Sequence, residues 1–317
     1  MLDLVMQNLN EYLQASQKYY DKLFDNVEHN NIVNGVDVNL HFKYLKFDPN
    51  GNPKIDLLVN TLFNYFTHYC FSARKRTYDE NMDEMEQEFF RNELMNEAKE
   101  LFRKWQEEDI TDNNQPKSGE IGEMILWLVM EVVIKAPQVV AKMDLKTNPN
   151  LEVFGSDGIH LKIDDNDMLN IFFGEAKFYG DIYKALDSAF ESIEGFHSNE
   201  MNIHEYNLVT THYKYLKDTQ QDKIYKYITG KIKDHEVKIN HACLIGYDWD
   251  KYKRLDTNER IEFIKNFTEV YEEETKRLTN LIQTRFDKFS KKEFTFEVFF
   301  IPFKSVQELR TAFNGKL

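Results

Sequence analysis

Apolar positions recur along this chain with two different spacings, and each spacing predicts an element. In the first third, a period near 3.6 predicts helices, and one stretch that alternates between apolar and polar residues predicts a strand. The expected helices cover residues 2–24, 57–71 and 79–105, and the expected strand covers residues 38–44. The polar stretch 107–116 ends in a proline and is the best candidate linker. We therefore predict a mainly helical region over residues 1–116 and a second domain over residues 117–317.

Strand patterns dominate the beginning of the second domain. A helix is expected over residues 118–135, and Pro137 follows it. The next expected elements are strands at 138–145, 151–163 and 168–177, a helix at 181–193, a strand at 241–247, a helix at 259–286, a strand at 293–301 and a helix at 306–313. The domain thus begins with a helix, three strands, a helix and a strand, which predicts an α/β fold.

Composition excludes several classes of protein. An apolar fraction of 42% is enough for a buried core, and 12 Gly with 6 Pro exclude collagen-like and low-complexity chains. No apolar run reaches the ~18 residues of a membrane span, and the first residues lack the basic flank of a secretory signal. Cys70 and Cys243 supply neither a disulfide framework nor a zinc site. We therefore expect a cytoplasmic protein with reduced thiols and no membrane contact.

The charge of the chain is negative and unevenly distributed. Its 40 basic and 54 acidic residues leave a net charge of −14, which argues against a dedicated nucleic-acid coat protein. Residues 151–200 alone hold 11 acidic and 3 basic residues, a balance of −8. Such a local excess of carboxylates is typical either of a solvated face or of a site for a divalent cation.

The candidate site lies in this acidic segment. Asp157 belongs to one expected strand, and Glu175 and Lys177 end the next one. Side chains two positions apart on a strand point to the same side, so Glu175 and Lys177 project together, and Asp157 lies opposite them if the strands form a hairpin. Two carboxylates this close favour a cation between them, and Mg²⁺ or Mn²⁺ suits such oxygen ligands. A neighbouring lysine can orient an attacking water and stabilise phosphoryl charge, as phosphodiester hydrolysis requires.

A Glu-x-Lys pair by itself is common on ordinary protein surfaces, but its surroundings favour a site here. Asp157 lies between two glycines, which let a ligand approach the backbone, and Glu175 follows an apolar strand that holds it rigidly. The preceding helix carries Glu120 and Glu123 on one face. We prefer Glu123 as the third carboxylate because it lies one turn deeper. Glu120 stays open as the alternative, although a carboxylate in a first helical turn is also favoured by the helix dipole.

These residues and the order of the elements resemble the core of the PD-(D/E)xK nucleases. Three segments are in particular similar to the HamA family, the nuclease subunit of the Hachiman anti-phage defence system. They are GEIGE at 119–123, GSDGIH at 155–160 and GEAKFY at 174–179. The superfamily name places a proline before the aspartate, whereas this chain has Ser156 there.

The resemblance implies a fold, a metal and a partner. The fold would be a restriction-endonuclease-like core behind the helical N-terminal region. Asp157 and Glu175 would bind Mg²⁺ or Mn²⁺, Lys177 would be the catalytic lysine, and Glu123 or Glu120 would complete the site. A helicase would be the partner that senses DNA and restrains or releases the nuclease.

We therefore expect a metal-dependent DNA endonuclease that acts as the effector of an anti-phage complex. The negative net charge fits a division of labour in which the helicase partner binds DNA tightly. The main alternative is a catalytically silent subunit with a nuclease fold, which only docks and regulates a DNA-translocating partner. The intact set of Asp157, Glu175 and Lys177 disfavours that alternative. A third hypothesis is a helical scaffold in which the Glu-x-Lys pair is accidental.

Overall fold

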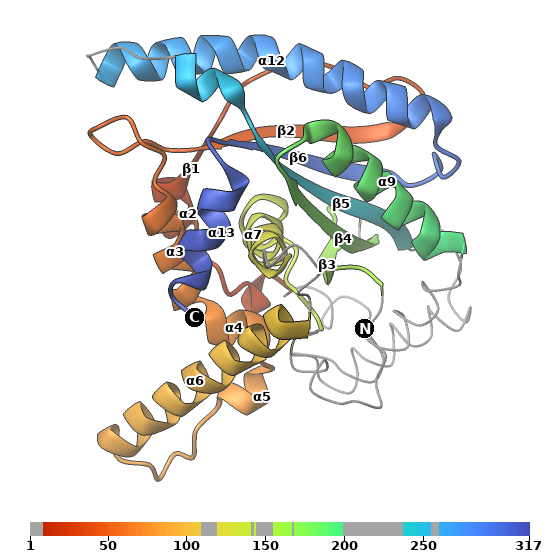
Figure 1. Cartoon of the computed structure of the whole chain (residues 1–317). Coiled ribbons are helices and arrows are strands. Elements are labelled where there is room, and N and C mark those ends of the chain that lie inside the picture. The colour runs from red at the N-terminus through yellow and green to blue at the C-terminus, as the bar shows by residue number, and fades with distance from the viewer. Residues whose placement is uncertain are drawn as a thin grey trace.

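The computed structural model describes residues 9–108, 119–140, 143, 155–166, 168–198, 237–254 and 260–317, and the statements below concern these residues. They form a mixed α/β fold around one six-stranded sheet (Figure 1). The strands are β1 (Phe24–Asn26), β2 (Asp37–Leu45), β3 (Gly158–Ile163), β4 (Leu169–Tyr179), β5 (Val237–Asp248) and β6 (Thr295–Phe303). Their order across the sheet is β1-β2-β6-β5-β4-β3. The four inner strands are parallel, and β1 and β3 are antiparallel strands at the two edges.

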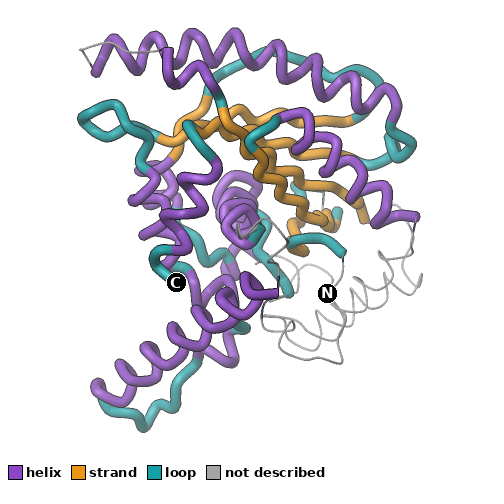
Figure 2. Tube along the Cα trace, viewed as in Figure 1, coloured by secondary structure: helices purple, strands orange, loops and turns teal. Residues whose placement is uncertain are grey.

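Helices cover both faces of the sheet (Figures 1 and 2). On one face, α9 (Ile182–Ser198) and α12 (Arg260–Lys288) share an apolar core with β2, β5 and β6. On the other face, α7 (Glu120–Val129) continues into the π-helical turn η2 (Met130–Ile134). It packs there with α2 (Gln17–Leu23), α3 (Ile55–Asn64), α4 (Phe66–Cys70), α6 (Glu84–Glu108) and α13 (Val306–Asn314). The short helices are η1 (Leu9–Tyr12), α5 (Ala73–Arg76) and η4 (Asp250–Arg254). None of the described helices is both long and apolar enough to cross a membrane.

The middle strand β6 shows why the apolar runs of the sequence become strands. All of its side chains are buried, because β5 and β2 flank it and helices cover both of its faces. Phe296 and Phe300 pack toward α12, and Phe299 and Ile301 pack toward the layer that contains α7. A parallel strand buried on both faces has a nearly continuous apolar sequence.

Most of the predicted elements are confirmed. The strands expected at 38–44, 168–177, 241–247 and 293–301 are β2, β4, β5 and β6, and the helices expected at 181–193, 259–286 and 306–313 are α9, α12 and α13. The helix expected over residues 118–135 corresponds to α7 and η2. It ends at Lys135, which has a left-handed backbone with φ of 62°, two residues before Pro137.

The single helix expected over residues 2–24 is wrong where the structure describes it, and residues 1–8 lie outside the described part. The chain forms η1, a break, α2 and then the strand β1. In the break, the Gln14 N–H donates to Glu131 Oε2 at 2.6 Å, and the Ser16 N–H donates to the Tyr65 hydroxyl at 3.0 Å. Because distant side chains accept from these N–H groups, no helical turn is needed to satisfy them.

The N-terminal region also contributes the strands β1 and β2 to the sheet. β1 pairs with β2, and β2 pairs in parallel with β6. The predicted boundary after residue 116 lies outside the described residues and stays a prediction. The strand expected at 138–145 is described only at 138–140 and 143, where Gln138 forms an isolated bridge with His160. The strand expected at 151–163 is described from residue 155, and β3 begins at Gly158.

Gly122 lets α7 approach the sheet closely, and this predicts a stability effect. A Cβ atom at residue 122 would lie 2.8 Å from Cδ2 of the buried Phe178. We expect Gly122→Ala to lower the free energy of unfolding by about 1–3 kcal/mol, the usual cost of overpacking, as measured by urea denaturation. Gly119→Ala is the matched control, because a Cβ there meets nothing within 4 Å. Equal urea midpoints for the two variants would contradict this prediction.

Candidate functional site

The β3–β4 hairpin brings Asp157 next to Glu175, as the sequence predicts. The two strands pair through Gly158 and Gly174, and Asp157 comes immediately before β3. The Asp157 N–H donates to the Gly174 carbonyl at 2.7 Å, and Asp157 Oδ2 accepts from the Ala176 N–H, also at 2.7 Å. Both the backbone and the carboxylate of Asp157 are therefore held against β4.

Glu175 and Lys177 project from the same side of β4. Lys177 Nζ lies 2.6 Å from Glu175 Oε1, and the Ser192 hydroxyl on α9 also bonds to this carboxylate. Glu175 is buried and Lys177 is half-buried. The inner strand β4 thus holds both charged groups on the face of the sheet that α9 covers.

Glu123 reaches the same group of charges from α7, whereas Glu120 lies elsewhere. The charge of Glu123 acts on both Asp157 and Glu175. Its Oε2 accepts a hydrogen bond of 3.0 Å from the Tyr69 hydroxyl on α4. Glu120 is buried one turn earlier, and its charge acts on Arg310 of α13. The structure therefore brings four of the five predicted residues together and leaves Glu120 apart.

The three carboxylates disturb one another strongly. Burial raises the pKa of Asp157 well above its usual range, and the charges of Glu175 and Glu123 raise it further. Burial also raises the pKa of Glu175, although Lys177 and the Ser192 hydroxyl oppose this shift. Burial alone would lower the pKa of Lys177, but Glu175 and Asp157 outweigh it, so the pKa of Lys177 is raised. Lys177 therefore remains a cation.

This balance of charges fits a hard divalent cation. When all groups are ionised, Asp157, Glu175 and Glu123 carry −3 and Lys177 carries +1, which leaves −2 in a largely buried space. Within the described residues, no group of three or more His, Cys, Asp or Glu side chains is placed so that it could hold a metal ion, so a site here would rest on two carboxylates, Asp157 and Glu175. Mg²⁺ and Mn²⁺ do not need such a group, because they are commonly held by one or two carboxylates and keep several waters. The donor set thus fits Mg²⁺ or Mn²⁺ better than a metal that needs a full cage of protein ligands.

Asp157 and Glu175 open into a cavity of about 340 Å³ between β4, β5 and α9. Its lining includes Asp157, Glu175, Lys177 and the hydroxyl-bearing Ser192, and also His241, which the sequence analysis did not single out. His241 Nε2 lies 2.8 Å from Nε2 of His197 on α9. Burial lowers the pKa of His241 to about 3 and that of His197 to about 4. Both imidazoles are therefore neutral at neutral pH and add no charge to the cavity.

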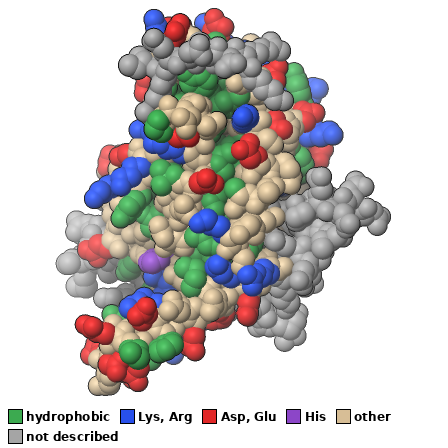
Figure 3. Space-filling model, turned by 60° about the vertical axis from the view of Figure 1, so that its left-hand side comes forward, with side chains coloured by type: hydrophobic (Ala, Val, Ile, Leu, Met, Phe, Trp, Pro, Cys, Tyr) green, Lys and Arg blue, Asp and Glu red, His purple; other side chains and the backbone are tan. Residues whose placement is uncertain are grey.

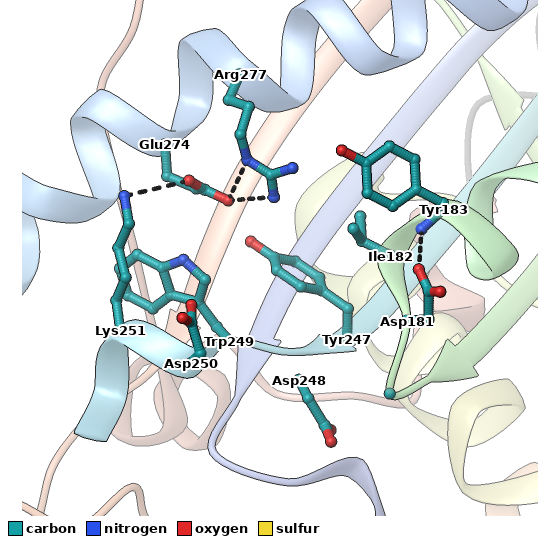
Figure 4. Close-up of a pocket in the computed structure, with 11 residues that line it drawn as sticks. Asp181, Ile182, Tyr183, Tyr247, Asp248, Trp249, Asp250, Lys251, Glu274 and Arg277 are labelled. Carbon is teal, nitrogen blue, oxygen red and sulfur yellow. Dashed lines mark hydrogen bonds and ion pairs between the residues drawn. The ribbon is translucent and has the colours of Figure 1, made fainter. Parts of the chain in front are cut away.

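A second cavity, of about 500 Å³, lies at the ends of β4 and β5 beside the start of α9 (Figure 4). Glu274 on α12 is buried in its wall and accepts hydrogen bonds from Arg277 Nε at 2.9 Å and Lys251 Nζ at 3.4 Å. Figure 4 shows both cations turned toward this carboxylate. Two cations thus compensate the buried Glu274, and Asp181, Asp248 and Asp250 also line this cavity.

The comparison with protein families agrees with the motifs. The profile of the HamA family matches residues 19–317, nearly the whole chain. The chain belongs to the HamA family. This HamA-family protein is therefore related to Hachiman antiviral defence. A comparison with curated proteins finds no match.

One polar neighbour of the candidate site in this HamA-family protein escaped the sequence analysis. Tyr69 is separated from Glu123 by 54 positions and lies in an apolar helix that reads as core. Neither its spacing nor its neighbours in the sequence indicate a polar role. Only the packing of α4 against α7 reveals that its hydroxyl is aimed at a carboxylate of the cluster.

Proposed function

We propose that this HamA-family protein is a metal-dependent DNA endonuclease and the effector subunit of a Hachiman complex with a helicase. The observation that carries the proposal is the meeting of Asp157, Glu175 and Lys177 around one cavity, where the charge of Glu123 also acts on both carboxylates. Structural ion pairs are normally balanced in charge, whereas this group keeps an excess of buried carboxylates. A buried and uncompensated acidic cluster beside a lysine favours a site that acts on a phosphate through a cation.

The arrangement of elements supports a restriction-endonuclease-like core. Helix α7, the bridged segment at 138–140, β3, β4, α9 and β5 follow one another in the order expected for it. The candidate residues occupy the helix, the turn before β3 and the second half of β4, which are the positions that the resemblance implies.

Each candidate residue has a distinct role in the proposed reaction. Asp157 and Glu175 would hold Mg²⁺ or Mn²⁺, which supplies Lewis-acid stabilisation of the scissile phosphate when bound. Lys177 stays protonated, so it stabilises the negative charge that develops on the phosphate and orients a water through its N–H groups. The Ala176 N–H and the Ser192 hydroxyl keep the two carboxylates in position.

The direct test of the proposed function is plasmid degradation by the purified protein. We expect cleavage in Mg²⁺ that stops when EDTA is added, measured with and without the co-purified helicase. If the intact complex protects cells against phage but never cuts DNA, the catalytically silent docking subunit becomes the better explanation.

The surface charge of the protein leads to a prediction about assembly. The net charge is −14, and on the face drawn in Figure 3 the lysine and arginine side chains are scattered among acidic and uncharged ones. Tight DNA binding depends on many phosphate contacts from basic side chains. We therefore expect weak DNA binding by this protein alone and a stable complex with the helicase encoded in the same system. Gel filtration of the co-expressed proteins tests this, and separate elution at micromolar concentration would contradict it.

A further inference from the structure

Tyr69 links the N-terminal helices to the candidate nuclease site. It lies on α4, and its side chain is 2% exposed. The Tyr69 ring packs between Phe102 on α6 and Trp127 on α7, with ring centroids 6.2 Å apart in both cases. Its hydroxyl donates to Glu123 Oε2 at 3.0 Å. The predicted boundary at residue 116 separates Tyr69 from all the carboxylates, yet the hydrogen bond joins the two sides.

The chemical nature of this donor matters for a cation site. A lysine or arginine at this point would orient Glu123 but also cancel its charge. A tyrosine hydroxyl orients the carboxylate and leaves the negative charge in place. The group around Asp157 and Glu175 therefore keeps the charge excess that attracts a divalent cation.

Tyr69 is also suited to remain a donor. Burial raises its pKa well above the ordinary tyrosine value, and the charge of Glu123 raises it further. The hydroxyl consequently stays protonated at neutral pH and can donate to Glu123. Since the charge of Glu123 acts on both Asp157 and Glu175, the direction of this carboxylate influences the other two.

We propose that Tyr69 is a positioning residue of the site, whose hydroxyl holds the Glu123 carboxylate so that its charge acts on Asp157 and Glu175, the two proposed ligands. The N-terminal helical region thereby contributes to the charge of the cation site. This inference rests on the proposed nuclease function. It adds that the domain beginning at residue 117 does not contain the whole site.

The first test is Tyr69→Phe, which keeps the ring and removes the hydroxyl. Losing a hydrogen bond to a charged group predicts cleavage about 10- to 100-fold slower. It also predicts a higher Mn²⁺ concentration for half-maximal cleavage and weaker Mn²⁺ binding in calorimetry without DNA. Tyr65→Phe is the matched control. Tyr65 is buried and packs against the same Trp127, but its hydroxyl bonds to Ser16.

A double-mutant cycle separates positioning from general loss of stability. If Tyr69 acts through Glu123, adding Tyr69→Phe to Glu123→Gln will change neither cleavage nor Mn²⁺ binding any further, because coupled residues are not additive. Independent effects of the two substitutions would overturn the inference. If Tyr69→Phe fails to fold, Glu123→Gln tests the premise instead, because its amide oxygen can still accept from Tyr69 and only the charge of Glu123 is lost. Unchanged Mn²⁺ binding in that variant would also overturn the inference.

The outcomes distinguish this inference from the function on which it rests. A wild-type protein that binds Mn²⁺ and cuts DNA, with a Tyr69→Phe variant that matches it in both assays, would refute the role of Tyr69 alone. A folded wild-type protein that neither binds Mn²⁺ nor cuts DNA would refute the nuclease function, and the role of Tyr69 with it.

Discussion

Replacing Lys177 with alanine is expected to slow DNA cleavage by orders of magnitude. Lys177 is the cation whose charge acts on both Asp157 and Glu175, and its Nζ lies 2.6 Å from Glu175 Oε1. Without Lys177, Asp157 and Glu175 lose this neighbouring cation, and no ammonium group remains there to stabilise the negative charge that develops on the phosphate. Loss of one preorganised electrostatic group typically costs ~10²–10³-fold in rate. The plasmid assay in Mg²⁺ measures this loss, and phage protection should fall with it.

Lys162→Ala is the matched control for this variant. Lys162 lies on the neighbouring strand β3 and pairs there with Asn170, several residues from the Gly158–Gly174 end where the carboxylates meet. We expect this variant to cut DNA at the wild-type rate. Both variants should fold and bind the helicase. Full phage protection by a folded Lys177→Ala protein would refute the nuclease function and favour the docking subunit.

Replacing Asp157 with asparagine is expected to remove cleavage and, at the same time, to stabilise the fold. The amide oxygen of asparagine can still accept the Ala176 N–H, but the buried negative charge disappears. The pKa of Asp157 is raised in the folded protein, so its ionised form opposes folding at neutral pH. A relief of about 1 kcal/mol would raise Tm by about 2–4 °C, which thermal unfolding without divalent cations can measure.

The pH dependence of this gain follows from the sign of the shift. Below the usual aspartate pKa of 3.8, Asp157 is protonated in both the folded and the unfolded protein, so wild type and variant should be equally stable. As pH rises from there toward the raised folded pKa, the unfolded chain loses its proton first, and the advantage of the variant grows. Adding Mn²⁺ should raise the Tm of the wild type more than that of the variant. A lower Tm for Asp157→Asn at neutral pH would contradict this account.

The parts of the fold that the sequence predicts well are those whose cause is local. The apolar run of β6 and the helical period of α9 arise from burial of the element itself, so spacing alone reveals them. The approach of Asp157 to Glu175 was predictable for the same reason, because a hairpin between successive strands brings them together.

The parts that escaped prediction depend on contacts between distant segments. The helix expected over residues 2–24 breaks where Gln14 and Ser16 donate to Glu131 and Tyr65, which lie far along the chain. The hydrogen bond from Tyr69 to Glu123 likewise joins a candidate carboxylate on α7 to α4, a helix whose own sequence indicates only core packing. Tertiary contacts of this kind override local preference, and one sequence carries no pattern that announces them.

The position of β6 determines when the sheet can be assembled during protein synthesis. β6 bonds to β5 on one side and to β2 on the other, and Asp37 of β2 meets Thr295 of β6 across 258 positions of the chain. Until the ribosome has made β6, β2 and β5 have no common neighbour, and a nascent chain holds two separate half-sheets with open edges. Such non-local pairing slows folding and leaves strand edges exposed. Translation order therefore makes the complete six-stranded sheet one of the last features of the fold to form.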